Sequence, residues 1–436
     1  MKPILALMLF PIPVLSLGWQ VRAWQWRENV QDFFGNPYKK SRVPQFMLDS
    51  NHPWILENQA KLEKLPDAES YLCFSSQGHT IDVNRGKPGG EGNGLAIPPD
   101  LFDYLEIDNS RFGISRPGWP NALLRAQEIQ RCPAALSQAK TFKTRIYVYE
   151  SEYSDWDKRI LEPPQPPREL LDLYADILGN TSLETLKWDI APKYAHYFGE
   201  RFVDRGLAVP TAKTLEVSPM NHFLVPMCSN ITELVYQCRT WERYFIHGGE
   251  DPELLLLQAS MFTPNLTRLV MDAEWEFDNS KVQALVSTIP GLRSLGLRGE
   301  LRSQYRYSNY GDSSGSMLNE ILQILGSLQN LTQLELPDAS ALDLGWDGGP
   351  MCGNAYFGPG GRDYERLVYR DALEATERAA AIVVKVLPRL TDFSIGSDQA
   401  IITRYENGTL RASFPWTGRL DEYIMEILPG GPDGPD

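Results

Sequence analysis

A short leucine pattern recurs through the chain and constrains its fold more than any other sequence feature. The pattern L-x-x-L-x-L, with conservative apolar substitutes, occurs seven times. Most copies follow a segment with helical periodicity and a turn residue, so each unit predicts a helix, a turn and a short strand. The seven triplets are Leu183/Leu186/Trp188, Ala212/Leu215/Val217, Ile231/Leu234/Tyr236, Leu266/Leu269/Met271, Leu292/Leu295/Leu297, Leu331/Leu334/Leu336 and Leu390/Phe393/Ile395.

The pattern also predicts how the units assemble. On a strand, the two apolar residues of L-x-L point to the same side, and the preceding amphipathic helix covers that side. A single unit cannot bury its apolar face, so successive units stack with parallel strands along one wall. The sequence therefore predicts an α/β fold, namely an irregular leucine-rich-repeat solenoid with a parallel strand wall and helices outside.

The spacing of the triplets divides the rest of the chain. Only 19 residues separate Ala212 from Ile231, whereas 59 separate Leu331 from Leu390, which indicates insertions on the helix side of the array. We predict a signal peptide at 1–23, a loop-rich, irregular N-terminal cap region at 24–130, the repeat array at 131–414 and a C-terminal tail at 415–436. A weaker first unit has its helix in CPAALSQA and its strand at 145–149 (RIYVY).

The end of the array has three recognisable segments. A glycine-rich insertion at 345–364 precludes helix and strand, and loops of this length in compact proteins are usually functional or disordered. A long helix is predicted from about residue 363 to residue 387. The segment AIITRY-ENG-TLRASF predicts a hairpin that turns at Asn407-Gly408 and caps the open end of the array.

The first residues predict a compartment. Lys2 is followed by the uncharged run 3–17 (PILALMLFPIPVLSL), which is typical of a secretory signal peptide and too short for a membrane-spanning helix. Small residues allow cleavage before Trp19 or before Trp24. A buried N-terminal helix is the alternative, but its prolines disfavour it. We therefore expect a secreted, extracellular protein with no stable membrane anchor.

The charge balance excludes two classes of partner. The chain has 56 Asp and Glu against 42 Lys and Arg, a net charge of −14. A general nucleic-acid binder needs a basic face that displaces counterions from phosphates, and an anionic membrane attracts a basic surface. We therefore expect neither a nucleic acid nor an anionic membrane as partner.

Five cysteines are too few for a disulfide-rich scaffold, and no CxxC pair occurs. In an oxidising compartment, Cys228 and Cys238 are the best candidates for a disulfide because a span of ten residues can fold back on itself. Buried reduced thiols that act as small hydrophobic residues are the alternative.

The residues of the repeat carry a family resemblance. Irregular L-x-x-L-x-L units after N-L-T or P-x-L turns, together with CGNAYFGPGG at 352–361, resemble the leucine-rich arrays of uncharacterised filamentous-fungal F-box-like proteins. The resemblance covers roughly residues 130–414. It implies a leucine-rich-repeat fold and a role as a substrate receptor of a ubiquitin ligase. The F-box itself is not evident near the N-terminus, where the predicted signal peptide lies instead.

Five N-x-S/T sequons are candidate glycosylation sites: Asn180, Asn230, Asn265, Asn330 and Asn407. Asn230, Asn265 and Asn330 occupy the same phase of the repeat, just before the first apolar position, so one turn template explains all three. Asn407 lies in the predicted hairpin turn. Asn180 has no such explanation and is the best single candidate.

The segment MDAEWEFD at 271–278 alternates apolar and acidic residues. On one strand, Asp272, Glu274, Glu276 and Asp278 would share a face, with the carboxylates about 7 Å apart. Such a strip attracts calcium or a basic partner. An ordinary solvated strand edge, protected from aggregation by its charge, is the alternative interpretation.

Motifs for catalysis, metals and cofactors are absent from the sequence. The five histidines show no metal-ligand spacing, and neither a G-x-S-x-G elbow nor a phosphate-binding loop occurs. We therefore predict no enzyme activity, no catalytic or metal residues and no cofactor. An enzyme with an unfamiliar site is the minor alternative.

The predicted function is binding. We expect a secreted, non-enzymatic leucine-rich-repeat protein that binds a protein or glycan through its strand wall. The alternative is an intracellular F-box-like substrate receptor with a degenerate N-terminus. The exposed wall positions are the central residues of each L-x-L: Lys187, Glu216, Val235, Val270, Gly296, Glu335 and Ser394. Lys187, Glu216 and Glu335 join the acidic strip as partner-binding candidates.

Overall fold

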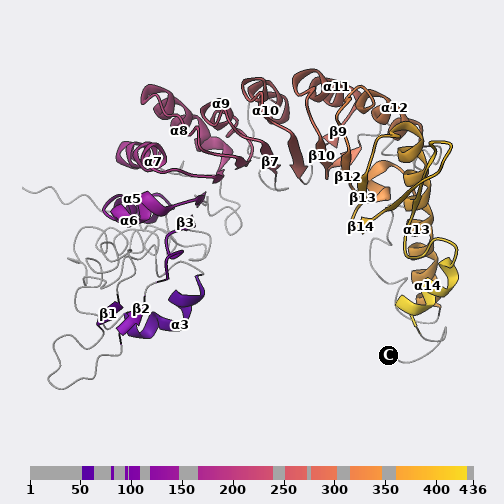
Figure 1. The fold of residues 1–436 in the computed structure, drawn as a ribbon, viewed down its shortest axis with the longest axis horizontal. Helices are drawn as coiled ribbons and strands as arrows, with labels where there is room; N and C mark the ends of the chain where they lie inside the picture. The colour runs from indigo at the N-terminus through magenta and orange to yellow at the C-terminus, as the bar shows by residue number, and fades with distance from the viewer. Residues whose placement is uncertain are drawn as a thin grey trace, which may run out of the picture. The chain divides into compact units, whose positions relative to one another are not determined.

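The computed structural model describes residues 52–62, 80–82, 94–96, 98–108, 118–146, 165–238, 251–272, 276–301, 315–345 and 360–429 (Figure 1). The chain divides into two compact units. The first comprises Met1–Leu136 and Arg145–Leu173, and the second comprises Ser137–Thr144 and Tyr174–Asp436.

The first unit contains α3 (Pro53–Leu62), β1 (Thr80–Asp82), β2 (Gly94–Ala96), β3 (Tyr104–Asp108) and α5 (Gly118–Gln130). Strands β1 and β2 pair antiparallel. Helix α5 buries Ala122, Ala126 and Ile129, which recur every three or four residues and so lie on one face of the helix. The N-terminal region that we predicted to be partly irregular thus contains regular helices and strands.

The second unit alternates helices and strands. Its boundary with the first falls in α6 (Pro133–Gln138), β4 (Thr141–Ile146) and α7 (Arg168–Asn180). The elements that follow are β5 (Thr185–Ile190), α8 (Pro192–Asp204), β6 (Thr214–Val217), α9 (Leu224–Met227), β7 (Glu233–Gln237), α10 (Pro252–Ala259), η3 (Ser260–Phe262), β8 (Arg268–Asp272), β9 (Glu276–Phe277), α11 (Asn279–Thr288), β10 (Ser294–Leu297), β11 (Glu300–Leu301), α12 (Ser316–Leu325), β12 (Gln333–Leu336), η4 (Ala339–Leu342), α13 (Gly361–Val386), β13 (Asp392–Ile395), β14 (Asp398–Gln399), β15 (Ile401–Arg404), β16 (Leu410–Ser413) and α14 (Leu420–Ile427).

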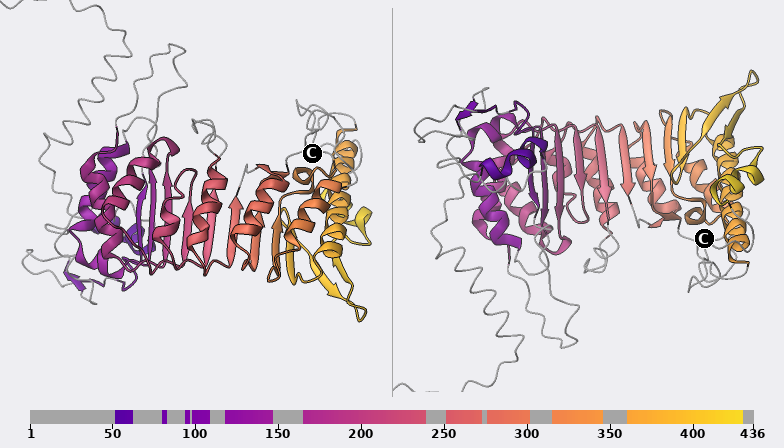
Figure 2. Two further views of the ribbon diagram at one scale, coloured as in Figure 1. Left: turned by 90° about the horizontal axis from the view of Figure 1, so that it is seen from above. Right: turned by 90° about the horizontal axis from the view of Figure 1, so that it is seen from below.

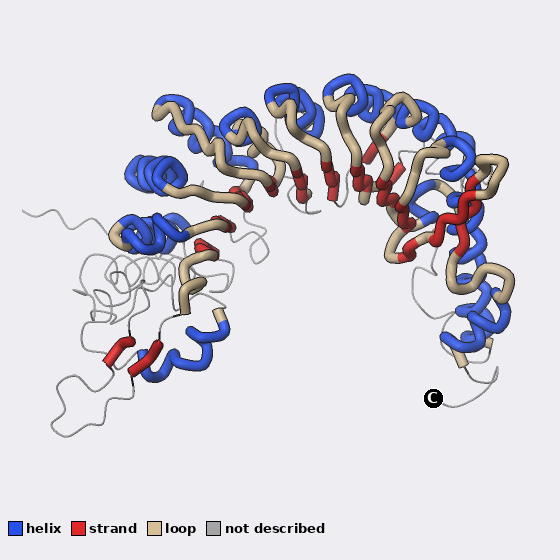
Figure 3. The backbone as a smooth tube through the Cα atoms, viewed as in Figure 1, coloured by secondary structure: helices blue, strands red, loops and turns tan. Residues whose placement is uncertain are grey.

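A large, mostly parallel sheet organises these elements. It has ten strands in the order β14-β13-β12-β10-β8-β7-β6-β5-β4-β3. Strands β5, β6, β7, β8, β10, β12 and β13 pair in parallel, each with the next, and β14 returns antiparallel beside β13. In the second unit the helices lie on one side of these strands, which run side by side (Figures 2 and 3). The fold is therefore mixed α/β, and all seven predicted strands are confirmed.

Two backbone contacts recur from one helix–strand unit to the next. The N–H of the first apolar residue of a triplet closes a turn with the carbonyl three residues before it, as in Leu266 to Thr263 at 3.1 Å. One carbonyl of each unit then accepts two N–H groups of the next unit, as Thr232 O accepts from Thr267 N and Arg268 N at 3.0 Å each. This turn and this shared carbonyl recur in successive units although the segments between them differ in length.

Aromatic side chains fill the beginning of the second unit. Tyr174, Trp188, Phe198 and Phe202 are all buried and meet edge to face, with ring centroids 5.3 to 6.0 Å apart. The Tyr174 hydroxyl forms a hydrogen bond with Thr144 Oγ1 at 2.7 Å. Burial raises the pKa of this phenol, so it stays neutral within the core.

The end of the array agrees with the prediction except in two places. Helix α13 (Gly361–Val386) confirms the long helix, and β15 pairs with β16 as the predicted hairpin, with Gly408 at φ 82° in its turn. The predicted insertion 345–364 is shorter than expected, because α13 already begins at Gly361; residues 346–359 lie outside the described residues. The predicted tail contains α14, which buries Ile424.

The weak first unit agrees with the prediction in its helix but not in its strand. Helix α6 confirms the helix of the weak first unit, but the strand predicted at 145–149 begins earlier, at Thr141. Phe142, Thr144 and Ile146 are buried, so every second residue of this strand points into the core.

The predicted signal peptide lies outside the described residues. No helix among the described residues is long and apolar enough to cross a membrane.

Candidate binding surface

The repeat register places equivalent side chains in columns across the sheet. Leu186, Leu215, Leu234, Leu269, Leu295, Leu334 and Phe393 pair with one another from strand to strand, and each is at most 1% exposed. Their neighbours point to the opposite side of the sheet. We call the outward side chains of β5, β6, β7, β8, β10, β12 and β13 the strand wall. This wall is the candidate binding surface.

The central wall positions form one aligned column, as predicted. Lys187 pairs with Glu216, Glu216 with Val235, and the column continues to Ser394 in the same register. Two members are not exposed, which corrects the prediction: Val270 is only 3% exposed, and Gly296 is buried. The position that a Cβ on Gly296 would take lies 3.2 Å from Val270 Cγ1. The missing side chain therefore lets Val270 pack onto β10.

Lys187 and Glu216 neutralise each other on the wall. Lys187 Nζ on β5 lies 3.0 Å from Glu216 Oε2 on β6. Both side chains remain partly exposed, so water screens their attraction and the pair contributes little to stability, on the order of 0.5 kcal/mol. A partner that binds here meets a dipolar pair and no isolated charge.

A second ion-pair network crosses the centre of the wall. Arg268 on β8 reaches Glu233 on β7 at 3.1 Å and Glu335 on β12 at 3.3 Å. Arg298, just after β10, approaches the same Glu335 at 2.7 Å. Arg268 crosses from β8 to β12 over β10, where Gly296 has no side chain to obstruct it. The network holds two arginines and two glutamates, so this part of the wall is electrically balanced.

The acidic strip predicted at 271–278 does not form. Strand β8 ends at Asp272, and Glu276 lies on β9, which belongs to a separate two-stranded sheet with β11. Glu274 lies outside the described residues. Asp278 is the N-cap of α11 and is not on a strand. The perfect alternation was misleading because the chain changes from one sheet to another within it.

The Asp278 carboxylate has a structural partner in α11. It accepts a hydrogen bond from the Lys281 backbone N–H at 2.9 Å and one from the Ser280 hydroxyl at 2.6 Å. Partial burial by itself raises the pKa of this carboxyl, but the hydrogen bonds from Ser280 and Lys281 outweigh it and hold the pKa below its ordinary value. Asp278 therefore caps a helix.

We expect Asp278→Ala to lower the free energy of unfolding by about 1 kcal/mol near neutral pH, since the cap of α11 is lost. Because the folded-state pKa is lowered, the stabilisation is present above the ordinary aspartate pKa of about 3.9 and disappears as the pH falls through the lowered value. Urea unfolding at neutral pH and at about pH 2.5 measures this difference. An equal loss at both pH values would contradict the assignment, and Asp278→Asn, which still caps, is the control.

The predicted Cys228–Cys238 disulfide is not formed. Cys228 is a free, buried thiol at the end of α9, and burial raises the pKa of the thiol to about 12. Strand β7 lies between the two cysteines and extends the chain by about 3.3 Å per residue. A disulfide needs Cα atoms within about 7 Å, so the strand carries Cys238 away from Cys228.

The five sequon asparagines all have exposed side chains. Asn180 is the last residue of α7, Asn230, Asn265 and Asn330 lie in the turns before β7, β8 and β12, and Asn407 lies in the hairpin turn. The structure thus brings the three equivalent sequons to one place in the repeat, as the sequence predicted.

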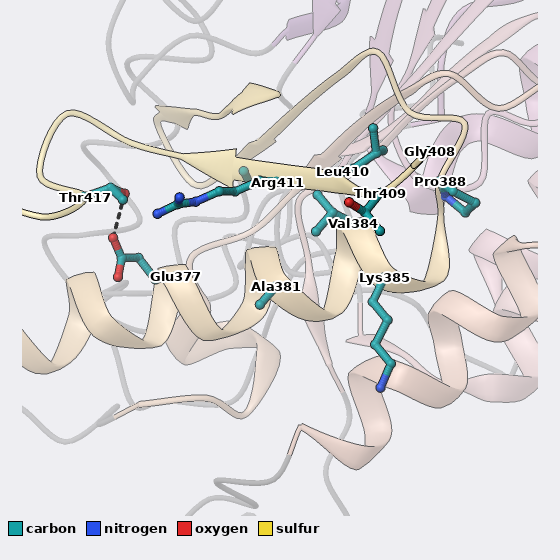
Figure 4. Close-up of a pocket in the computed structure, with 11 residues that line it drawn as sticks. Glu377, Ala381, Val384, Lys385, Pro388, Gly408, Thr409, Leu410, Arg411 and Thr417 are labelled. Atoms are coloured by element: carbon teal, nitrogen blue, oxygen red, sulfur yellow. Dashed lines mark hydrogen bonds between the residues drawn. The ribbon is translucent and has the colours of Figure 1, made fainter. Parts of the chain in front are cut away.

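A groove of about 630 Å³ lies between α13 and the β15–β16 hairpin (Figure 4). Ala381, Val384 and Leu410 make it partly apolar, and Glu377 accepts a hydrogen bond from Thr417 Oγ1 at 2.6 Å. Lys385 extends away from the hairpin in this view. None of the predicted partner-binding residues lines the groove, so it is separate from the strand wall.

Arg268 and Glu233 are wall residues that the prediction missed, and it also missed Arg298, which contacts the wall residue Glu335. Arg268 and Glu233 stand two positions before the central wall residues of their strands, so strand alternation alone places them on the outward side. Arg298 follows β10 and had no such signal. In the part of the chain that the structure describes, no three His, Cys, Asp or Glu side chains could hold a metal ion.

Comparison with known proteins identifies no family for this chain. No protein-family model matches the chain, and a search of the curated proteins found no match. The strand wall and its columns are therefore the basis for the function proposed below.

Proposed function

We propose that residues 131–414 form an irregular leucine-rich-repeat solenoid and that the protein is a non-enzymatic binding protein. One observation carries this proposal: seven strands of unequal spacing in the sequence keep a single register. The same turn precedes each of these strands after β5, and the same pair of hydrogen bonds to one carbonyl connects successive units. A repeated unit that buries one face and exposes the other is the arrangement expected of a solenoid.

The partner that we propose is a protein or a glycan bound on the strand wall. Seven strands about 4.8 Å apart make a face roughly 30 Å long. Such a face suits an extended partner, because one residue from each strand meets it in turn. The paired charges of Lys187 with Glu216 and of Arg268 with Glu335 give the face polar groups of both signs. A neutral or mixed-charge partner fits this pattern best.

The compartment that we propose is extracellular. The uncharged run after Lys2 has the length of a signal peptide. Exposed sequon asparagines are compatible with passage through the secretory pathway. The resemblance to F-box-like arrays is retained here for the repeat architecture alone.

We expect Val235→Arg with Ser394→Arg to abolish partner binding without unfolding the protein. Both residues are half-buried members of the central wall column, so the two added charges alter the wall. Purified protein is used to capture partners from the medium of the native culture and is also probed on a glycan array. At least a tenfold loss of the captured species is expected.

The control adds the same charges to the helix side. Gln258→Arg on α10 and Gln323→Arg on α12 change exposed residues away from the wall, so binding should persist. Equal loss in both double variants, or no loss in either, contradicts binding through the wall. Co-purification with a ubiquitin-ligase scaffold, with Met1 still present, would support the intracellular adaptor instead.

A further inference from the structure

We propose that the edge of the sheet where the parallel strands begin is a glycan-bearing edge. N-linked glycans at Asn180, Asn230, Asn265, Asn330 and Asn407 would form one row along it. The inference rests on the proposed secretion of the protein, because N-linked glycans are added in the secretory pathway. It goes further by placing all five glycans at one edge of the sheet. None of the five asparagines belongs to the strand wall.

Three of the asparagines occupy equivalent turns. Asn265 precedes Leu266, whose N–H closes the turn on Thr263 O at 3.1 Å. Asn230 and Asn330 precede Ile231 and Leu331, whose N–H groups close the same turn at 3.1 and 3.2 Å. Because the strands that follow are parallel and in register, these turns come to the same edge of the sheet.

The two remaining asparagines lie at the same edge but in other elements. Asn180 ends α7, and the chain enters β5 five residues later. Asn407 lies in the hairpin, where Arg404 Nη2 donates to Pro388 O at 2.9 Å. Pro388 is in the turn before β13, and it lines the α13 groove together with Gly408 and Thr409 (Figure 4). The hairpin turn thus lies beside the last turn of this edge.

The turns themselves do not require asparagine. The equivalent position holds Thr211, Gly291 and Arg389 before β6, β10 and β13. Among the described non-glycine residues, positive φ angles occur at Met220 and Asp343, so no turn asparagine is in the left-handed region. Asn265 and Asn330 are exposed, and their amides form no hydrogen bond with the described residues. A turn preference alone therefore does not account for them.

The threonines of these sequons, by contrast, have a structural role. The hydroxyls of Thr232, Thr267 and Thr332 each donate to a carbonyl of the preceding repeat at 3.3 to 3.4 Å. Thr391 makes the same contact at 3.2 Å without a sequon, because Arg389 stands where the asparagine would be. Asn230 also makes a contact of this kind, from its Nδ2 to Pro210 O at 3.0 Å. Packing therefore explains the threonines and Asn230 but not Asn265 or Asn330, and this difference provides the test.

The experiment uses the full chain, with its own N-terminus, recovered from the medium of a eukaryotic culture. Enzymatic removal of N-glycans converts each modified asparagine to aspartate, which peptide mass spectrometry locates. We expect aspartate at all three turn positions, Asn230, Asn265 and Asn330, and at Asn180 and Asn407. Mature protein should begin at Trp19 or Trp24. Asn265→Gln should lose one glycan mass and remain secreted.

A gain-of-glycan variant tests the geometry of the edge. Arg389→Asn completes a sixth sequon with Leu390 and Thr391 in the equivalent turn, and we expect one additional glycan. Arg389→Gln, which completes no sequon, should add none. Secreted protein modified at fewer than three of the five asparagines, or Arg389→Asn without an added glycan, would overturn the glycan-bearing edge and leave binding through the wall untouched. Unmodified protein retained in the cell with Met1 intact would overturn both this edge and the proposed compartment.

Discussion

Replacing Asn221 with leucine is expected to lower the free energy of unfolding by about 3–5 kcal/mol. Asn221 is completely buried. Its Oδ1 accepts a hydrogen bond from Trp188 Nε1 at 3.1 Å, and its Nδ2 donates to Ile190 O at 2.9 Å. The same Nδ2 also contacts Ser218 Oγ and Pro219 O, each at 3.0 Å. Leucine satisfies none of these groups, so the indole N–H and the carbonyls lose their buried partner.

Equilibrium unfolding in urea measures this loss. The matched control is Asn279→Leu, which removes an exposed amide that donates to Glu320 at 2.9 Å, and we expect a change below about 1 kcal/mol. Trp188→Phe removes the indole N–H, so part of the cost of Asn221→Leu should disappear in the double variant. Equal losses for the buried and the exposed asparagine would refute a structural role for the buried amide.

The second large effect is expected for Lys281→Met. Lys281 Nζ lies 3.4 Å from Glu253 Oε2 and 3.2 Å from Asp251 Oδ2. The Glu253 side chain is only 3% exposed, and the Tyr236 hydroxyl lies 3.3 Å from its Oε1. Removing the ammonium group leaves a buried carboxylate without its compensating charge. We expect a loss of about 3–5 kcal/mol in the free energy of unfolding.

Two further variants isolate the buried charge. Glu253→Gln combined with Lys281→Met removes both charges and should recover much of the lost stability. Lys187→Met, which breaks the partly exposed pair with Glu216, should cost less than about 1 kcal/mol. If Lys187→Met is as destabilising as Lys281→Met, then burial does not set the importance of these pairs.

Asn221 and Lys281 stabilise different parts of the second unit. Asn221 satisfies backbone groups where the chain leaves β5 and β6, and Lys281 joins the start of α11 to the start of α10. The Asp251 cap of α10 takes part in this second contact. Burial by itself raises the pKa of the Asp251 carboxyl, but its hydrogen bonds with Glu253 and Leu254 and the charge of Lys281 hold the pKa below the ordinary value. These two polar contacts thus join neighbouring helix–strand units of the second unit.

The sequence alone determined where the seven parallel strands β5, β6, β7, β8, β10, β12 and β13 form and that the apolar residues of each L-x-L are buried. Each L-x-L places two apolar residues on one side of a strand, and burying that side is worth on the order of 25 cal/mol per Å². The sequence also predicted the long helix α13 and the hairpin with its Asn407-Gly408 turn, because helical spacing and turn chemistry are local properties.

Only the tertiary structure decided what the charged side chains do. The alternation in MDAEWEFD suggested one strand, but the chain passes from β8 to β9 within it, and Asp278 caps α11. Local periodicity carries no information about a change of sheet. Likewise Arg268 and Glu335 are 67 residues apart in the chain and meet because Gly296 on the strand between them leaves room. Ion pairs and cysteine pairing depend on distances between residues far apart in the sequence, and those distances are set by the packing of the whole fold.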